Sequence, residues 1–168
     1  MEKYIFREYK PEYKKFFRTK KTKLKKLLGK SVKIEHVGST AIVGLGGKVI
    51  IDILVGIPKN KIEKVREKLE KAGYLFSKKA STPDRLFLKK DYFHKGGKKR
   101  IHIHLTILNS EEWKDIILFR DYLKKHPELI EKYAKIKKSA AKKARGKGKI
   151  YRKQKEKFIK TILKKAKA

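Results

Sequence analysis

Apolar residues recur at helical spacing in two segments of the first half of the chain. Between residues 9 and 28 they repeat every three to four positions, and Gly29 then favours the end of a helix. A shorter repeat covers residues 60–73, where Asn60 followed by Glu63 resembles a capping box. Lysines occupy many of the positions between the apolar ones. The pattern therefore predicts two amphipathic helices, each with an apolar face for the core and a basic face for solvent.

Other segments have the composition of β-strands. The strongest is residues 48–57, which are β-branched and almost continuously apolar, as in a central strand that is buried on both faces. Two further apolar runs flank residues 94–99, where the paired glycines Gly96 and Gly97 can adopt the positive φ of a hairpin turn. These two runs predict an antiparallel hairpin. In chain order, the predicted strands are residues 31–37, 48–57, 74–76, 85–93 and 100–108.

The pattern becomes helical again from Ser110 onward. Pro127 favours the start of a second helix in this region, and residues 146–148 break that helix before a last one at 150–164. Residues 137–149 are rich in Lys, Ala and Gly, so they form either a phosphate-facing arm or a locally mobile segment. Three consecutive helices are therefore predicted.

Size and composition exclude several classes of protein. The chain has 168 residues, and we expect a single domain over residues 1–168, of α/β (α+β) class, with a helical, lysine-rich portion from about residue 110. The absence of Cys excludes disulfides, a thiolate nucleophile and zinc sites built on thiolates. No apolar run reaches the roughly 18 residues that span a bilayer, and the start lacks the apolar stretch of a signal peptide. We therefore expect a protein of the cytoplasm without membrane contact.

The charge of the chain is strongly and unevenly positive. The net charge of +33 comes from 50 basic and 17 acidic residues, and residues 132–168 alone carry 17 Lys or Arg and one acid. Such an excess causes self-repulsion unless anions cover it. RNA is the predicted partner because phosphates repeat charge along a strand, and a generic solvated surface is the alternative. The cations expected to contact RNA are Lys142, Lys143, Arg145 and Lys147.

Two polar features lie close together in an otherwise apolar region. Gly38, Ser39 and Thr40 directly follow a predicted strand, and Asp52 interrupts the most apolar one. Backbone N–H groups at such a turn can hold phosphate oxygens, and a strand carboxylate can hold the divalent ion that bridges them. The alternatives are an ordinary capping turn and a salt bridge between Asp52 and one of the many lysines.

The last predicted strand adds a second polar face. Because side chains alternate along a strand, Arg100, His102, His104 and Thr106 share one face. Two adjacent histidines can bind a metal or a phosphate, or form a hydrogen-bonded polar surface. Arg85 opens the preceding strand, and its planar guanidinium can hold a phosphate through two nitrogens.

Several short motifs follow one another from about residue 34 to residue 160. They are His36–Ala41, Gly44 with Leu45, Lys48, Ile50–Val55, His102–Leu105, Phe119–Leu123, Tyr133 with Lys137, and Tyr151 with Lys155. In this order they resemble the motifs of the GrpB family, which is similar in fold to nucleotidyltransferases of the polymerase-beta type. The resemblance implies a mixed sheet flanked by helices, with Gly-Ser after the first strand and a metal-binding carboxylate on the next.

The resemblance also implies a function and a role for each candidate residue. The chain would bind a nucleoside triphosphate with Mg²⁺ or Mn²⁺ and transfer a nucleotide to RNA, such as tRNA, or to a small acceptor. Asp52 would hold the metal with His104 or His102, Glu35 is the nearest further acid, and Asp52 and His104 would be catalytic. The residues expected to contact the nucleotide are Gly38, Ser39, Thr40, Lys48, Arg85, Arg120, Tyr151 and Lys155.

Leu54 departs from the wider pattern. Active nucleotidyltransferases carry a second carboxylate two positions after the first, where this chain has Leu54 after Asp52. A non-catalytic RNA-binding module that keeps the fold is therefore the main alternative, and a metal-dependent hydrolase that uses the histidine pair is a third. Two assignments also have structural alternatives, because Arg120 can pair with Asp121 or a helix C-terminus and Tyr151 can pack in the core.

Overall fold

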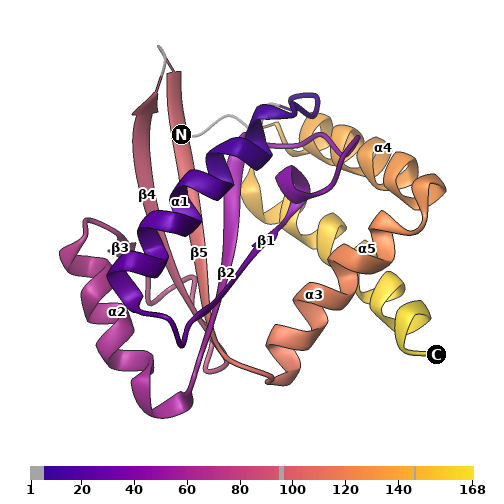
Figure 1. Cartoon of the computed structure of the whole chain (residues 1–168). Coiled ribbons are helices and arrows are strands. Elements are labelled where there is room, and N and C mark those ends of the chain that lie inside the picture. The colour runs from indigo at the N-terminus through magenta and orange to yellow at the C-terminus, as the bar shows by residue number, and fades with distance from the viewer. Residues whose placement is uncertain (1–5, 95–96, 146) are drawn as a thin grey trace.

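A mixed β-sheet lies at the centre of the molecule (Figure 1). This computed structural model describes residues 6–94, 97–145 and 147–168. The strand order is β1-β2-β5-β4-β3, in which β2 and β5 pair in parallel and the other neighbours are antiparallel. The predicted fold class, a mixed sheet flanked by helices, is confirmed. The strands are β1 Lys33–Val37, β2 Ile50–Ile57, β3 Leu75–Phe76, β4 Arg85–His94 and β5 Gly97–Ile107.

Two helices, α1 (Glu12–Leu28) and α2 (Ile62–Lys71), pack on one face of the sheet. The apolar residues that recur along α1 are buried against aliphatic side chains of β1, β2 and β5. Burial of such a stripe stabilises an amphipathic helix more than its intrinsic propensity does. Helix α1 ends where Gly29 adopts a φ of 95°. Both helices lie where the spacing predicted them.

The opposite face is only partly covered. Helices α3 (Glu111–Lys124), α4 (Pro127–Ala144) and α5 (Gly148–Lys167) pack together beside the sheet (Figure 1). Trp113 of α3 packs on Val37 and Leu54, and Gly56 leaves the space for its ring, because an added Cβ would lie 2.6 Å from it. Farther along this face, the side chains of β5 and β4 remain half-buried. The polar side chains of the candidate site lie there.

Most element boundaries agree with the prediction to within a few residues, but the proposed capping box is wrong. Asn60 lies inside a short helical turn, Lys59–Lys61, and α2 starts after Lys61 without a side-chain cap. The hairpin is confirmed, although residues 95–96 of its predicted turn lie outside the described part of the chain. Gly146, in the predicted break before α5, also lies outside it. No helix among the described residues is long and apolar enough to cross a membrane.

Candidate functional site

Asp52 is the centre of a polar cluster on the partly covered face of the sheet. In the strand register, Asp52 of β2 lies beside Val37 of β1 and His102 of β5. Its Oδ1 atom lies 3.0 Å from His104 Nε2 and 3.6 Å from His102 Nδ1. The predicted alternation along β5 thus brings both histidines to the carboxylate. The side chain of Asp52 is 22% exposed, so a ligand in solution can reach it.

Two opposing effects set the charge of Asp52. Burial alone would raise its pKa, but the hydrogen bond from His104 and the nearby ring nitrogen of His102 outweigh burial and hold the pKa well below its usual range. Burial lowers the pKa of His104 by more than the nearby carboxylate raises it. At neutral pH, an ionised Asp52 therefore accepts a hydrogen bond from Nε2–H of a neutral His104.

Two buried nitrogen atoms beside this pair have no hydrogen-bond partner among the described residues. They are Nδ1 of His104 and Nε of Arg85. A terminal nitrogen of Arg85, Nη1, lies 3.1 Å from a carboxylate oxygen of Glu112 on α3. A buried polar atom without a partner costs free energy, so such atoms mark places where water or a ligand completes the site.

The Gly38–Ser39 turn lies directly against Asp52. Gly38 has a φ of 74°, and an added Cβ would overlap the Asp52 carboxylate. Only glycine therefore allows both this backbone conformation and this close approach. Thr40 was expected to bind the nucleotide, but it is buried and its hydroxyl donates to the carbonyl oxygen of Ile50 at 3.1 Å. That hydroxyl also lies 3.0 Å from His36 Nε2, so Thr40 fixes the turn.

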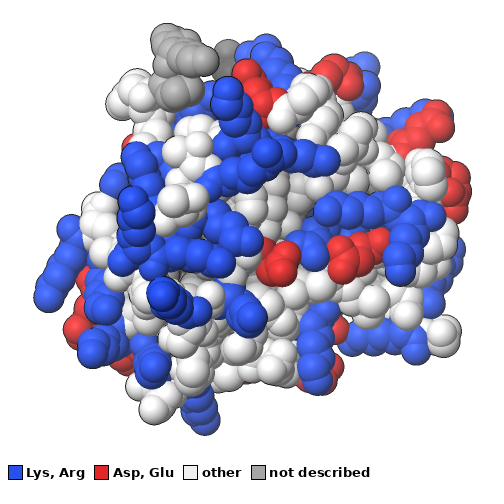
Figure 2. Space-filling model, in the orientation of Figure 1, with Lys and Arg blue, Asp and Glu red and all other residues white. Residues whose placement is uncertain are grey.

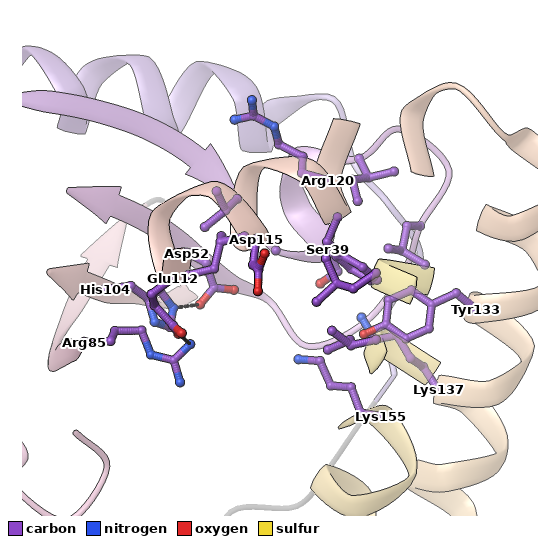
Figure 3. A pocket seen from close by; sticks show the side chains of 18 residues that line it. Ser39, Asp52, Arg85, His104, Glu112, Asp115, Arg120, Tyr133, Lys137 and Lys155 are labelled. Atoms are coloured by element: carbon purple, nitrogen blue, oxygen red, sulfur yellow. Dashed lines mark hydrogen bonds and ion pairs between the residues drawn. The ribbon is translucent and has the colours of Figure 1, made fainter. Parts of the chain in front are cut away.

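A cavity of about 280 Å³ opens beside the turn (Figure 3). Its walls come from segments far apart along the chain, because the sheet and the turn after β1 supply one side and the three C-terminal helices supply the other. Seven of the predicted site residues line it. Six of them are Gly38, Ser39, Asp52, Arg85, His104 and Arg120, and the seventh, Lys155 of α5, lies across from the sheet. The additional polar residues that line it are Glu112, Asp115, Tyr133 and Lys137.

Lys137 is the main site residue that the sequence did not assign. It is only 2% exposed, and its Nζ donates to the carbonyl oxygen of Gly46 at 3.0 Å. Burial lowers its pKa well below the usual value, and the positive charges of Lys155 and Lys48 lower it further, against the opposing effect of Asp52. Positive charge therefore outweighs negative charge around its amine. In the sequence, the signal that could have identified Lys137 as a site residue was its place in the motif with Tyr133.

Arg120 belongs to an ion network at the edge of this cavity. Its Nη1 atom donates to Glu35 at 2.7 Å and to the carbonyl oxygen of His36 at 2.9 Å, and its Nε atom donates to Asp121 at 2.8 Å. The structure therefore shows the pairing with Asp121 that was the alternative to a nucleotide contact. Glu35, expected near the metal, binds Arg120 and does not line the cavity around Asp52.

The family of the chain follows from comparison with known proteins. The family model described as "GrpB protein" matches residues 4–165. The chain belongs to the GrpB family. The family inferred from the sequence motifs is therefore confirmed.

Relatives of this GrpB-family chain include proteins of similar and of greater length. "Glutamate-rich protein GrpB" of Alkalihalophilus pseudofirmus is 33% identical over 90% of this chain and 88% of that protein. "UPF0157 protein YqkA" of Bacillus subtilis is 32% identical over 79% of this chain, which spans 38% of that protein. These names state no substrate or reaction.

Solved structures include a member of the same family. The crystal structure of conserved protein GrpB from Enterococcus faecalis has a TM-score of 0.82 at 30% identity and covers 96% of both chains. A structure of Cid1 poly(U) polymerase covers 78% of this chain and 43% of the polymerase, with a TM-score of 0.45 at 18% identity. That second likeness is too distant to bear on activity.

The described residues of the GrpB-family chain offer few ligands for a two-metal centre beside Asp52. Among the described residues, no three His, Asp or Glu side chains lie where they could hold one ion together. Leu54, at the position of the second carboxylate, is fully buried against Trp113, and Glu35 is bound to Arg120. Two ions held a few ångströms apart require more ligands than Asp52 and the two histidines supply.

The remaining predicted contacts of the GrpB-family chain lie at different depths. Tyr151 is buried and packs with Ala140 and Ala144, and the Nζ atom of Lys48 lies 5.7 Å from the centre of its ring. The packing alternative for Tyr151 thus describes its position. The predicted RNA contacts are exposed where α4 ends and α5 begins, and they do not line the cavity; they are Lys142, Lys143, Arg145 and Lys147.

Proposed function

We propose that this chain binds a nucleoside triphosphate, as a complex with one divalent cation, in the cavity beside Asp52. The observation that carries the proposal is the placement of an ionised carboxylate, the Gly38–Ser39 turn and two lysines, Lys137 and Lys155, around one opening. A triphosphate needs both kinds of group, because its oxygens bind cationic side chains while its cation binds a carboxylate.

The lysine end of the cavity suits the phosphates. Lys155 and Lys48 lie near enough to Lys137 for their positive charges to lower its pKa. A phosphate among them would relieve this repulsion, and its negative charge would favour a protonated Lys137. The Ser39 hydroxyl lies beside Lys137, because a Cβ added to Gly47 would contact both side chains. We assign the phosphates to this corner.

The cation arrives as part of the nucleotide complex. Mg²⁺ and Mn²⁺ both form such complexes, and Asp52 adds one carboxylate oxygen to a shell that the phosphates and water otherwise complete. We assign His102 and His104 to holding that carboxylate in place, since both already contact its Oδ1 atom. This assignment differs from a resident two-ion centre and requires no further acid.

Nucleotidyl transfer to RNA or to a small acceptor is the second candidate function. The ionised Asp52 beside a Gly-Ser turn favours it, whereas the buried Leu54 favours binding of nucleotide and RNA without transfer. Because only one carboxylate faces the cavity from β2, we propose binding as the main function. The lack of a three-ligand group among the described residues also gives no support to a metal-dependent hydrolase.

Calorimetric titration of each nucleoside triphosphate with Mg²⁺ tests the proposal. Asp52→Asn keeps the shape of the side chain and removes its charge, so we expect affinity for at least one triphosphate to fall at least about tenfold, or about 1.4 kcal/mol. Asp91→Asn is the matched control, because Asp91 pairs with Arg100 and lies outside the cavity. Equal affinity of wild type and Asp52→Asn in the presence of Mg²⁺ would contradict the proposal.

A further inference from the structure

A second cavity of about 280 Å³ lies between α1 and α3. Strand β1 forms the edge of the sheet, with α1 packed on one of its faces and α3 on the other. A groove therefore runs along β1 between the two helices, with Phe17, Ile34 and Ala41 in its lining. In Figure 2, Lys and Arg side chains lie on both sides of a pale hollow on this face of the molecule.

The cations of this groove form two rows that face each other. Lys14, Arg18 and Lys21 follow one another at intervals of four and three residues on α1, which places them on one side of that helix. Arg120 and Lys124 are four residues apart on α3. Each row thus repeats positive charge about every 5.4 Å, one turn of a helix.

The groove carries a large surplus of positive charge. Its lining contains five cations and one acid, Glu35, which is already bound to Arg120. Lys14, Arg18, Lys21 and Lys124 form no salt bridge to any residue in the part of the chain that the structure describes. Burial lowers the pKa of Lys124, and the charges of Arg120 and Lys14 lower it further, against Asp121 and Glu35. These like charges repel one another until an anion lies between them.

We propose that the groove between α1 and α3 binds the phosphate backbone of an RNA strand. Two facing rows of cations fit a chain of phosphodiesters better than a single small anion, because a strand repeats its charge along the length of the rows. Phe17 and His36 stack at 4.5 Å in the groove lining and give it a fixed apolar floor. This site differs from the end of α4, where the sequence had placed the RNA contacts.

Arg120 connects the groove to the cavity beside Asp52. It lines both, and three acceptors from β1 and α3 fix its guanidinium. A strand in the groove therefore lies next to the opening in which we place the nucleotide. The groove proposal does not rest on that nucleotide, because the two sites share Arg120 but neither Asp52 nor the groove lysines.

The test compares two variants with the same loss of charge. In the groove variant, Lys14, Lys21 and Lys124 are replaced by Gln; in the control variant, the same change is made at Lys64, Lys71 and Lys78, which are exposed and lie outside the groove. Fluorescence anisotropy gives the affinity of each protein for a labelled single-stranded RNA over a range of salt concentrations. Circular dichroism confirms that both variants are folded.

We expect the groove variant to bind RNA about tenfold more weakly than the control variant at moderate salt. The slope of log affinity against log salt should fall by about 2, because each phosphate contact on a single strand contributes about 0.7. Similar losses in both variants would contradict the proposal, since diffuse charge would then account for binding. A second result would also contradict the proposal. In that result the groove variant keeps its RNA affinity, and the affinity falls strongly when four other cations are replaced by Gln, namely Lys142, Lys143, Arg145 and Lys147.

Two further arms separate this proposal from other possibilities. Vesicles that contain anionic lipid are tested with the same proteins, and a groove variant that loses vesicle binding but keeps RNA binding would overturn the proposal. Triphosphate binding should be unchanged in the groove variant, and RNA binding should be unchanged in Asp52→Asn. Failure at one site can therefore be distinguished from failure at the other.

Discussion

The side chain of His36 lies on the opposite face of the sheet from that of Asp52, and several neighbouring groups hold it in place. Its ring stacks on Phe17 of α1, and its Nε2 atom lies 3.0 Å from the Thr40 hydroxyl. Burial lowers its pKa to about 4, and the positive charges of Lys124, Arg120 and Lys14 contribute, while Asp52 opposes them. The histidine is therefore neutral in the folded protein at neutral pH, which preserves the turn that carries Ser39.

We predict that His36 makes the protein sensitive to mild acid. The unfolded chain takes up a proton as pH falls through the ordinary pKa of 6.5, whereas the folded chain resists it down to about pH 4. Its contribution to stability is thus present above pH 6.5 and is lost between pH 6.5 and about 4, by about 3 kcal/mol. Urea unfolding at several pH values measures this loss.

His36→Phe is the matching variant for this measurement. Phe keeps a ring to stack on Phe17 and cannot be protonated. The free energy of unfolding of wild type, relative to that of the variant, should therefore decrease as pH falls from 6.5 to 4. A difference that stays constant over this range would show that His36 does not titrate as its surroundings indicate.

The sequence predicted the central site residues because each has a local signal. Asp52 stands out in an apolar strand, and alternation places His102 and His104 on one face. Apart from its place in the family motif with Tyr133, Lys137 has no such signal, because in a helix rich in Lys and Ala its position looks like any other basic one. Its burial depends on the approach of Gly46, which only the folded chain brings about.

At the scale of elements, β2 and α3 together decide what surrounds Asp52. Leu54 is fully buried with Val37 and Trp113, and Gly56 accommodates the Trp113 ring. Where a nucleotidyltransferase of the implied type would have its second carboxylate, this protein has packing between a strand and a helix. The position serves the hydrophobic core and does not face the cavity.

We predict that Leu54→Asp destabilises the protein and does not create transfer activity. The variant loses the burial of Leu and places a carboxylate against Trp113, so we expect the free energy of unfolding to fall by about 3 kcal/mol or more. Leu54→Asn has a similar shape without the charge and should be less affected. Urea unfolding measures the stability, and extension of a labelled RNA measures the transfer. Leu54→Asp that is as stable as wild type and extends RNA with Mg²⁺ would favour nucleotidyl transfer as the ancestral function.

Helix and strand positions were predictable because apolar spacing records which face is buried. The start of α2 was not, because the backbone forms the turn Lys59–Lys61 before the helix and Asn60 is inside that turn. The pairing of Arg120 with Glu35 also escaped prediction, since these residues are 85 positions apart and meet only when α3 crosses β1.

At the scale of the whole molecule, topology places the two proposed sites, the cavity beside Asp52 and the groove between α1 and α3, on either side of the Arg120 guanidinium. The order β1-β2-β5-β4-β3 places the hairpin histidines beside Asp52, and the helices α3 to α5 close the cavity from the other side. Sequence patterns predicted the helices, the strands and the positive charge, and the family resemblance implied a sheet flanked by helices. Neither predicted that helices α3 to α5 close the cavity, because its walls come from segments far apart along the chain. The net charge of +33 then acts through specific surfaces, of which the groove between α1 and α3 is the one proposed for RNA.

The most direct test of the nucleotide site is a crystal structure of the protein grown with a nucleoside triphosphate and Mn²⁺. The anomalous scattering of Mn²⁺ locates the ion independently of the nucleotide. We predict one Mn²⁺ peak at the Asp52 carboxylate, with the phosphates at the Gly38–Ser39 turn and near Lys137 and Lys155. Triphosphate bound only in the groove between α1 and α3, or Mn²⁺ bound away from Asp52, would contradict the central claim.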